Sequence, residues 1–309
     1  MRPLVSALCF LFFAAAHGQT LQQQVATLAQ SHAGKVAVYA EDLTTHASVA
    51  LSPDTPVQTA STIKLLILLE AVEQIRAGHA HLEDRLTLAP ADRVPGSGIL
   101  THLDAPLELT FKDVLTLMIA LSDNTATNLA IDRLGVSAIN ARAATLGLRQ
   151  THLYKKVFTP VAAGTILPDD FKQFGLGKTT PREITQIMRT LATCSFTPPS
   201  LANDAVLCNA ALAMLYLQQT RTGIPYFLDA LPGATGTSIA NKTGALDAVR
   251  SDVGAVSTPH GLVLLALFTY DNQDRRWIEQ NPNELFLATL ARTIVSAWSP
   301  QGLAPWPKK

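Results

Sequence analysis

The stretch that most constrains this chain is Ser61-Thr62-Ile63-Lys64 with the apolar run behind it, Leu65 to Val72. The run is long enough for a helix, contains no proline and ends near Gly78, so it predicts a buried helix that begins at about Ser61. Residues three apart share one face of a helix, so the amine of Lys64 can reach the hydroxyl of Ser61. Apolar surroundings lower the proton affinity of an amine, and a neutral lysine can activate a serine as a nucleophile.

The same spacing also has a purely structural interpretation. Ser61 can serve as the N-cap of the helix, and Lys64 can extend its aliphatic stem out of the core toward solvent. A single S-x-x-K motif carries a high false-positive risk, so the rest of the chain must decide between the two interpretations.

Composition limits the class of protein. The 309 residues suffice for one large domain or two lobes with a real core. Hydrophobic residues make up 48% and charged residues 16%, which excludes a disordered chain. The formal net charge is zero and no basic run is interleaved with aromatic residues, so nothing favours nucleic acid as a partner.

Residues 1–18 have the pattern of an export signal. Arg2 supplies the charged start, Leu4 to Ala16 is apolar, and small residues precede Gln19. The alternative is a retained membrane anchor, although the apolar stretch is shorter than the roughly 20 residues of a spanning helix. We therefore expect a secreted or periplasmic protein without a stable membrane span after signal removal.

Two cysteines remain after the signal, Cys194 and Cys208. In an exported protein they can form a disulfide, or they can be two small buried thiols, and the sequence leaves both open. Neither lies near a second Cys or a His pair at ligand spacing, so we expect no zinc site and no other metal.

Strand patterns occur near both ends of the chain, at residues 36–40, 47–51, 238–244, 248–256 and 262–269. Helical patterns fill most of the middle. The sequence therefore predicts an α/β (α+β) fold in which both chain ends build one antiparallel sheet, flanked by terminal helices, beside an all-helical lobe.

We predict one domain over residues 19–309. Residues 19–59 and 216–309 form its α/β lobe, and residues 60–215 form its helical lobe. Within the latter, residues 150–180 read as a long loop with few periodic apolar positions, and such loops in compact domains are usually functional or disordered.

Three short motifs follow one another in a definite order: Ser61-Thr62-Ile63-Lys64, Ser122-Asp123-Asn124 and Lys242-Thr243-Gly244. They fall at a predicted helix start, an interhelix loop and a strand end. One such motif is weak, but three in this order resemble the set found in class A β-lactamases and penicillin-binding proteins. The segments 96–100, 115–128, 179–181 and 250–253 extend the resemblance over essentially the whole mature chain. It implies a β-lactamase/transpeptidase-like fold.

The resemblance also implies roles for individual residues. Ser61 would be the nucleophile with Lys64 as its proton partner. Ser122, helped by Lys242, would pass a proton to the departing nitrogen. Asn124 would bind the side-chain amide of the substrate, and Lys242 and Thr243 would hold its carboxylate. Gly244 and Ala245 would complete the substrate-binding residues. The backbone N–H groups of Ser61 and Ala245 would form the oxyanion hole, where donors act on developing charge.

The sequence departs from the family in one loop. Class A β-lactamases carry a glutamate before the Thr-Thr-Pro helix, and it activates the water that releases the acyl group. Here no acidic residue occurs between Asp132 and Asp169. Asp169 and Asp170 are candidate deacylation bases only if the loop folds back. General-base assistance is worth roughly 10²–10⁴-fold, so we expect deacylation to be slow.

These features predict a serine β-lactamase-type hydrolase that opens the β-lactam amide through an acyl-serine. The alternatives are a D-alanyl-D-alanine peptidase-like penicillin-binding enzyme and a penicillin sensor that stays acylated. We expect a small-molecule or D-Ala-D-Ala-like peptide substrate, no cofactor and a monomer.

Overall fold

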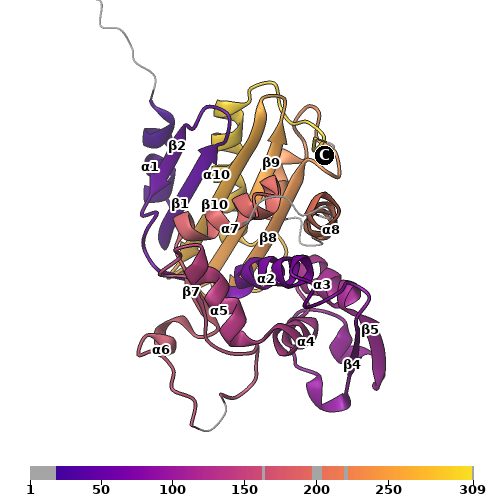
Figure 1. Ribbon diagram of the computed structural model, residues 1–309. Coiled ribbons are helices and arrows are strands. Elements are labelled where there is room, and N and C mark those ends of the chain that lie inside the picture. The colour runs from indigo at the N-terminus through magenta and orange to yellow at the C-terminus, as the bar shows by residue number, and fades with distance from the viewer. Residues whose placement is uncertain (1–18, 162–163, 197–203, 219–221, 308–309) are drawn as a thin grey trace, which may run out of the picture.

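Both ends of the chain contribute strands to one antiparallel sheet, as the sequence predicts. The computed structural model describes residues 19–161, 164–196, 204–218 and 222–307, so the export signal predicted for residues 1–18 lies outside the described residues. The strand order is β2-β1-β10-β9-β8 (Figure 1). The strands are β1 Lys35–Asp42, β2 Ser48–Leu51, β8 Ile239–Leu246, β9 Val249–Thr258 and β10 Gly261–Tyr270.

Alternation along the strands divides the core into two layers. Val36 and Val38 pack with α1 (Leu21–Gln30), α9 (Ile224–Leu228) and α10 (Pro282–Trp298). The intervening Ala37 belongs to the larger core on the opposite face of the sheet, because successive side chains of a strand point to opposite faces. Since both faces are covered, every residue of β9 is buried.

The helical lobe is built around α2 (Lys64–Arg76). Its residues 65–69 are fully buried, and α3 (Phe111–Ala120), α4 (Asn124–Leu134) and α5 (Val136–Thr145) surround it. Two further helices join this lobe to the sheet, namely α7 (Pro181–Thr193), which contacts β1, β9 and β10, and α8 (Asp204–Tyr216), which contacts β8. Figure 1 shows α2 crossing between the sheet and α4.

The second lobe is not purely helical, which corrects the sequence prediction. It contains a ribbon of β4 (Arg85–Leu88) and β5 (Leu107–Thr110), although the sequence predicts a helical lobe over residues 60–215. A second small sheet has the order β3-β7-β6, and it includes residues of the predicted long loop. Strands this short show no clear periodicity, because their stability depends on partners far along the chain. The other short elements are β3 Val57–Gln58, β6 His152–Leu153, β7 Gly177–Thr179, α6 Phe171–Phe174 and the 3₁₀ turns η2 Pro90–Asp92 and η3 Leu100–His102.

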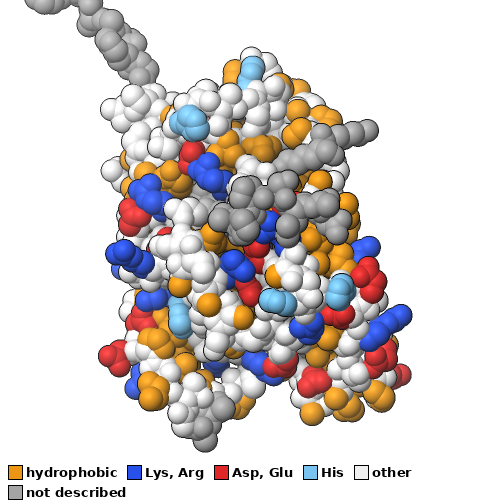
Figure 2. Space-filling model, in the orientation of Figure 1, with side chains coloured by type: hydrophobic (Ala, Val, Ile, Leu, Met, Phe, Trp, Pro, Cys, Tyr) orange, Lys and Arg blue, Asp and Glu red, His pale blue; other side chains and the backbone are white. Residues whose placement is uncertain are grey.

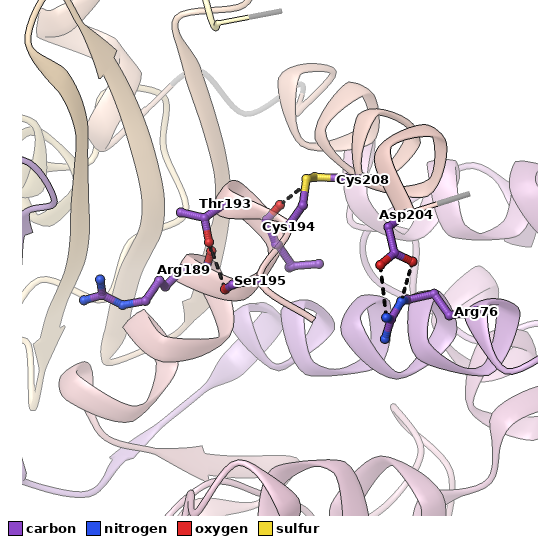
Figure 3. Close-up of a disulfide and its surroundings, with 8 residues drawn as sticks. Arg76, Arg189, Thr193, Cys194, Ser195, Asp204 and Cys208 are labelled. Carbon is purple, nitrogen blue, oxygen red and sulfur yellow. Dashed lines mark hydrogen bonds and ion pairs between the residues drawn. A yellow bond between two sulfur atoms is a disulfide. The ribbon is translucent and has the colours of Figure 1, made fainter. Parts of the chain in front are cut away.

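A disulfide joins Cys194, just after α7, to Cys208 in α8. Figure 3 shows this bond beside an ion pair between α8 and α2. In that pair the Arg76 guanidinium binds both carboxylate oxygens of Asp204, at 2.7 and 3.1 Å. The structure thus resolves the choice that the sequence leaves open for the two cysteines.

Acidic and basic side chains are mixed over the visible surface. Figure 2 shows Lys and Arg side chains interspersed with Asp and Glu on this face, as expected for a chain with zero net charge. Within the described residues, no helix is long and apolar enough to cross a bilayer.

Candidate active site

Ser61 lies in a 3₁₀ turn, η1 (Ala60–Ile63), which leads directly into α2 at Lys64. The sequence placed the helix start at about Ser61, so the prediction is close, but the first turn is tighter than an α-helix. Ala60 has a positive φ of 46°, which turns the chain sharply before the serine. The strand β8 approaches this turn closely. A Cβ on Gly244 would lie 2.8 Å from the carbonyl oxygen of Thr59, so only glycine fits there.

Lys64 is fully buried, and its side-chain nitrogen lies within hydrogen-bond distance of three oxygen atoms. Its Nζ donates to the carbonyl oxygen of Ser122 at 2.7 Å, to the Ser122 hydroxyl at 3.0 Å and to Asn124 Oδ1 at 3.2 Å. We expected contact with Ser61 one turn back. In the described part of the chain, however, the three bonds of Lys64 go to the second motif and none goes to the Ser61 hydroxyl.

The second motif occupies the junction between α3 and α4. Ser122 has a φ of 53°, an uncommon conformation for serine, and both its carbonyl and its hydroxyl face Lys64. Asp123 caps α4 through Ala126 N–H and also accepts the N–H groups of Ile99 and Leu100, at 2.7 and 2.9 Å. The central aspartate therefore has a structural role, while its two neighbours face the lysine.

A glycine-rich turn lies against this motif. A Cβ on Gly98 would come within 2.2 Å of the Asp123 side chain, and one on Gly96 within 2.6 Å of Asn124 Nδ2. Both glycines have positive φ. Asn124 Nδ2 also donates to the carbonyl of Pro95 at 3.1 Å. These contacts fix the carboxamide of Asn124, which on its other side accepts from Lys64.

Lys242 is the second buried lysine of the site. It is fully buried on β8, and its Nζ donates to the carbonyl of Thr243 at 2.9 Å. Burial lowers the pKa of Lys242 to about 7, while the charge of Asp252 opposes this shift. Burial also lowers the pKa of Lys64 well below its usual value, and the charge of Lys242 lowers it further. An amine with a depressed pKa gives up its proton more readily, which suits a group that must take and return protons.

The three motifs meet at one cavity of about 170 Å³. Ser61, Ser122 and the β8 residues Thr243, Gly244 and Ala245 contribute to its lining, whereas Lys64, Lys242 and Asn124 are not among the lining residues. The remaining lining residues are Ser97, Thr222, Gly223, Arg250, Ser251, Trp277, Glu284 and Leu287. The described residues contain no group of three His, Cys, Asp or Glu placed to hold a metal.

Arg250 also lines the cavity, although its sequence position predicted no role for it. It is 1% exposed, and its Nε pairs with Glu284 at 3.1 Å. It lies opposite Ala245 in the β8–β9 register. In the sequence, Arg250 occurs only within the segment 250–253, which contributes to the family resemblance. Its ion pair could not be predicted, because its partner Glu284 lies on α10, far along the chain.

Asp169 and Asp170 lie elsewhere. Asp170 accepts the Tyr154 hydroxyl at 2.6 Å and pairs with Lys178 at 2.5 Å, and these bonds lower its pKa. Asp169 is exposed. Neither carboxylate is among the described residues that line the cavity. The one carboxylate in that lining is Glu284, which is paired with Arg250.

The loop before β7 is held by α4 in a way that the sequence did not reveal. Asn128 accepts the Val157 N–H at 2.8 Å and donates to the Val157 carbonyl at 3.0 Å. Val157 is buried, whereas the adjacent Phe158 is 62% exposed with a φ of 50°. A Cβ placed on Gly96 would lie 3.0 Å from the Phe158 ring and 2.6 Å from Asn124 Nδ2. The Phe158 ring therefore lies beside Asn124.

The sheet lobe and the helical lobe, with the cavity where their motifs meet, have the β-lactamase/transpeptidase-like fold. The family model for the Beta-lactamase enzyme family matches residues 20–298. The chain is 24% identical to β-lactamase CTX-M-8 of Citrobacter amalonaticus over 284 residues, 92% of this chain and 91% of the relative.

Solved structures also have a similar fold over most of this chain. A β-lactamase from Sphaerobacter thermophilus superposes with a TM-score of 0.74 at 31% identity, over 90% of this chain and 96% of that one. The structure of PBP-A superposes with a TM-score of 0.73 at 26% identity, over 90% and 95%. The chain belongs to the class A β-lactamase family.

Proposed function

We propose that this chain is a serine hydrolase that opens β-lactam amides through an acyl-serine intermediate at Ser61, with slow deacylation. The relatives named β-lactamase support a β-lactam substrate. The observation that carries the proposal is the bond of 3.0 Å between Lys64 Nζ and the Ser122 hydroxyl, at a cavity that Ser61 and Ser122 both line.

In the proposed acylation, the Ser61 hydroxyl oxygen attacks the lactam carbonyl carbon and loses its proton to neutral Lys64. The developing oxyanion accepts hydrogen bonds from the backbone N–H groups of Ser61 and Ala245. The carbon–nitrogen bond then breaks, and Ser122 donates its proton to the departing nitrogen. Lys64, within hydrogen-bond reach of Ser122, returns a proton to it. Such relays favour groups whose pKa lies near the working pH.

The substrate would be bound on two sides. Asn124 is fixed by Lys64 and Pro95 and would bind the amide of the acyl side chain. On the opposite side, Thr243 and the positive charge of Lys242 would bind the carboxylate. Arg250 adds positive charge to the same side of the cavity.

Slow deacylation follows from the lack of an unpaired carboxylate among the described residues that line the cavity, since Asp170 lies outside this lining. Asp170 is engaged by Tyr154 and Lys178, and Glu284 is engaged by Arg250. A water molecule without a positioned base attacks the ester slowly, because general-base assistance contributes roughly 10²–10⁴-fold. We therefore expect a burst of product equal to the enzyme present, followed by slow turnover.

The second candidate is a D-alanyl-D-alanine peptidase-like penicillin-binding enzyme, or a penicillin sensor that remains acylated. The engagement of Asp170 and Glu284 by other residues favours this second candidate. Without a base to activate water, a penicillin that acylates Ser61 would stay bound. A point mutant of PBP-A has been solved as an acyl-enzyme complex with penicillin G, at 25% identity and a TM-score of 0.74.

Mass spectrometry of the protein after exposure to penicillin G tests the proposal. We expect an adduct of the penicillin mass on the peptide containing Ser61, which decays slowly to free enzyme and opened product. Ser61→Ala should show no adduct. An adduct that never decays, with cleavage of a D-Ala-D-Ala peptide, would favour the peptidase. A permanent adduct without peptide cleavage would favour the sensor, and no adduct at all would contradict every form of the proposal. We also propose that the mature chain is a secreted or periplasmic monomer, which chromatography of the periplasmic fraction can test.

A further inference from the structure

An exposed tryptophan lies at the edge of the candidate active site. Trp277 belongs to the segment between β10 and α10, and its side chain is 64% exposed. It is nevertheless one of the residues that line the cavity with Ser61. Large aromatic side chains usually bury most of their surface, so an indole held open at a catalytic cavity is available for a ligand.

The indole is fixed in place by two polar partners. Its Nε1 donates to Asp247 Oδ1 at 2.8 Å. The guanidinium carbon of Arg250 lies 4.5 Å from the ring centroid, which is within the range of a cation–π contact. Arg250 is itself held by Glu284 and by the carbonyl of Val249 at 2.9 Å. The ring is therefore positioned before any ligand arrives, and a fixed surface binds at a lower entropic cost.

The location of Trp277 specifies which part of a ligand it would meet. Arg250, beneath the ring, pairs with Ala245 in the register of β8 and β9, two residues beyond Thr243. Thr243 and Trp277 line the same cavity. Asn124, which would bind the acyl side chain, belongs to the helical lobe. The indole consequently lies on the side of the cavity where the substrate carboxylate would bind.

We propose that Trp277 is a stacking surface for a planar aromatic or conjugated substituent on the ring that carries the substrate carboxylate. This inference rests on the proposed function, and it narrows the substrate class. It predicts a preference for β-lactams whose carboxylate-bearing ring is extended by a flat, apolar group over those in which that position is small. An aromatic pair contributes about 0.5–1.5 kcal/mol, so we expect roughly a two- to tenfold preference.

The test compares two cephalosporins with the same acyl group. One carries a dinitrostyryl substituent on the carboxylate-bearing ring, and the other carries a methyl group. The second-order acylation rate constants are measured for the wild type, Trp277→Ala and Trp277→Phe. We expect Trp277→Ala to lose roughly two- to tenfold more rate with the styryl compound than with the methyl compound, and Trp277→Phe to keep most of the preference.

Phe158 provides a matched control. Its side chain is 62% exposed, close to the value for Trp277, but it lies beside Asn124. Since the two cephalosporins share their acyl group, Phe158→Ala should change both rate constants by the same factor. Equal losses for both compounds in Trp277→Ala would mean that the indole acts only by holding Arg250, and this would overturn the proposal. No loss with either compound in Trp277→Ala would overturn it as well.

A binding measurement separates this inference from the proposed chemistry. In Ser61→Ala, the styryl cephalosporin should quench indole fluorescence more strongly than it does in Ser61→Ala with Trp277→Phe. The chain has three tryptophans, so the double variant supplies the background from the other two. Equal quenching in both variants would contradict stacking on Trp277. Failure of both cephalosporins to acylate the wild type would instead contradict the proposed function, while the fluorescence difference would still decide the stacking.

Discussion

The side-chain nitrogen of Lys64 lies 2.7 Å from the carbonyl oxygen of Ser122 and 3.0 Å from its hydroxyl oxygen. A single lysine thus contacts both polar groups of a residue 58 positions away, and the φ of 53° at Ser122 presents both groups to it. Such an uncommon conformation costs free energy, which the surrounding contacts must offset. Strained residues of this kind concentrate at functional sites.

Replacing Lys64 with methionine should preserve the fold and remove most of the reactivity. Methionine fills the buried space without an amine, so Ser61 loses the group proposed to take its proton. We expect acylation by penicillin G to slow by roughly 10²–10⁴-fold, measured as adduct formation by mass spectrometry. Lys156→Met is the control, because Lys156 pairs with Asp132 at the surface. A rate within a few-fold of wild type in Lys64→Met would exclude Lys64 as the proton partner.

A glutamate at position 157 should accelerate deacylation. Val157 is buried, and Asn128, one turn after Asn124 on α4, holds its backbone from both sides. A carboxylate there would be buried, next to a backbone that Asn128 holds one turn of α4 from Asn124, and Asn124 accepts from Lys64. We expect Val157→Glu to shorten the lifetime of the penicillin adduct by roughly 10²–10⁴-fold.

The matched control for this variant is Phe158→Glu, since Phe158 is the exposed neighbour in the same loop. It adds the same charge one residue away, facing solvent. If both glutamates accelerate hydrolysis equally, the effect comes from charge in general and the positioned-base explanation fails.

Gly244 should not tolerate a methyl group. A Cβ there would lie 2.6 Å from Ser251 Oγ and 2.8 Å from the Thr59 carbonyl oxygen, so β8 would have to move away from the turn that holds Ser61. We expect Gly244→Ala to reduce the acylation rate and to lower the free energy of unfolding by about 1–3 kcal/mol, measured by urea denaturation. Gly236→Ala is the control, because its Cβ would meet nothing within 4 Å. Similar stability losses in the two variants would contradict the steric argument.

The pH dependence of acylation should depend on Asp252. Burial lowers the pKa of Lys242 to about 7, and Asp252 opposes that shift. Lys242 is charged below its pKa, so binding of a substrate carboxylate should weaken as the pH rises through about 7. Asp252→Asn removes the opposing charge and lowers this pKa, so the alkaline limb of the acylation profile should move to lower pH. A profile from pH 5 to 9 measures it, and a limb that stays in place or moves to higher pH would count against the role of Lys242.

The disulfide should stabilise the junction of α7 and α8. Cys194 and Cys208 are 14 residues apart, and closing a loop of this size in the unfolded chain is worth about 3 kcal/mol. The variant with both cysteines replaced by alanine should lose stability of this order in urea denaturation. Reduction of the wild type should give a similar loss, and it should leave the variant unaffected. No difference between oxidised and reduced wild type would show that the bond does not stabilise the fold.

Features with local causes were predictable from the sequence. Thr110, Thr180 and Asp123 cap the helices that follow them, because each side-chain oxygen accepts an N–H within three residues. The strands at both ends carry their own alternation or apolar runs, so the antiparallel sheet is confirmed. Three motifs in order indicated which segments would meet, because the resemblance supplied the tertiary arrangement that periodicity alone does not contain.

Other features have causes that are distant in the sequence, and only the tertiary structure decided them. It decided that Lys64 contacts Ser122, that Glu284 pairs with Arg250, and that Trp277 lies over the same arginine. It also paired Asp170 with Lys178 and joined Cys194 to Cys208. By itself, the sequence determined most of the helices and the strands of the five-stranded sheet, since backbone hydrogen bonding, capping and side-chain alternation act over a few residues. It did not predict the short strands β3 to β7 of the second lobe. The partners of the buried charges depend on which surfaces meet when those elements pack, and that is set by the geometry of the whole fold.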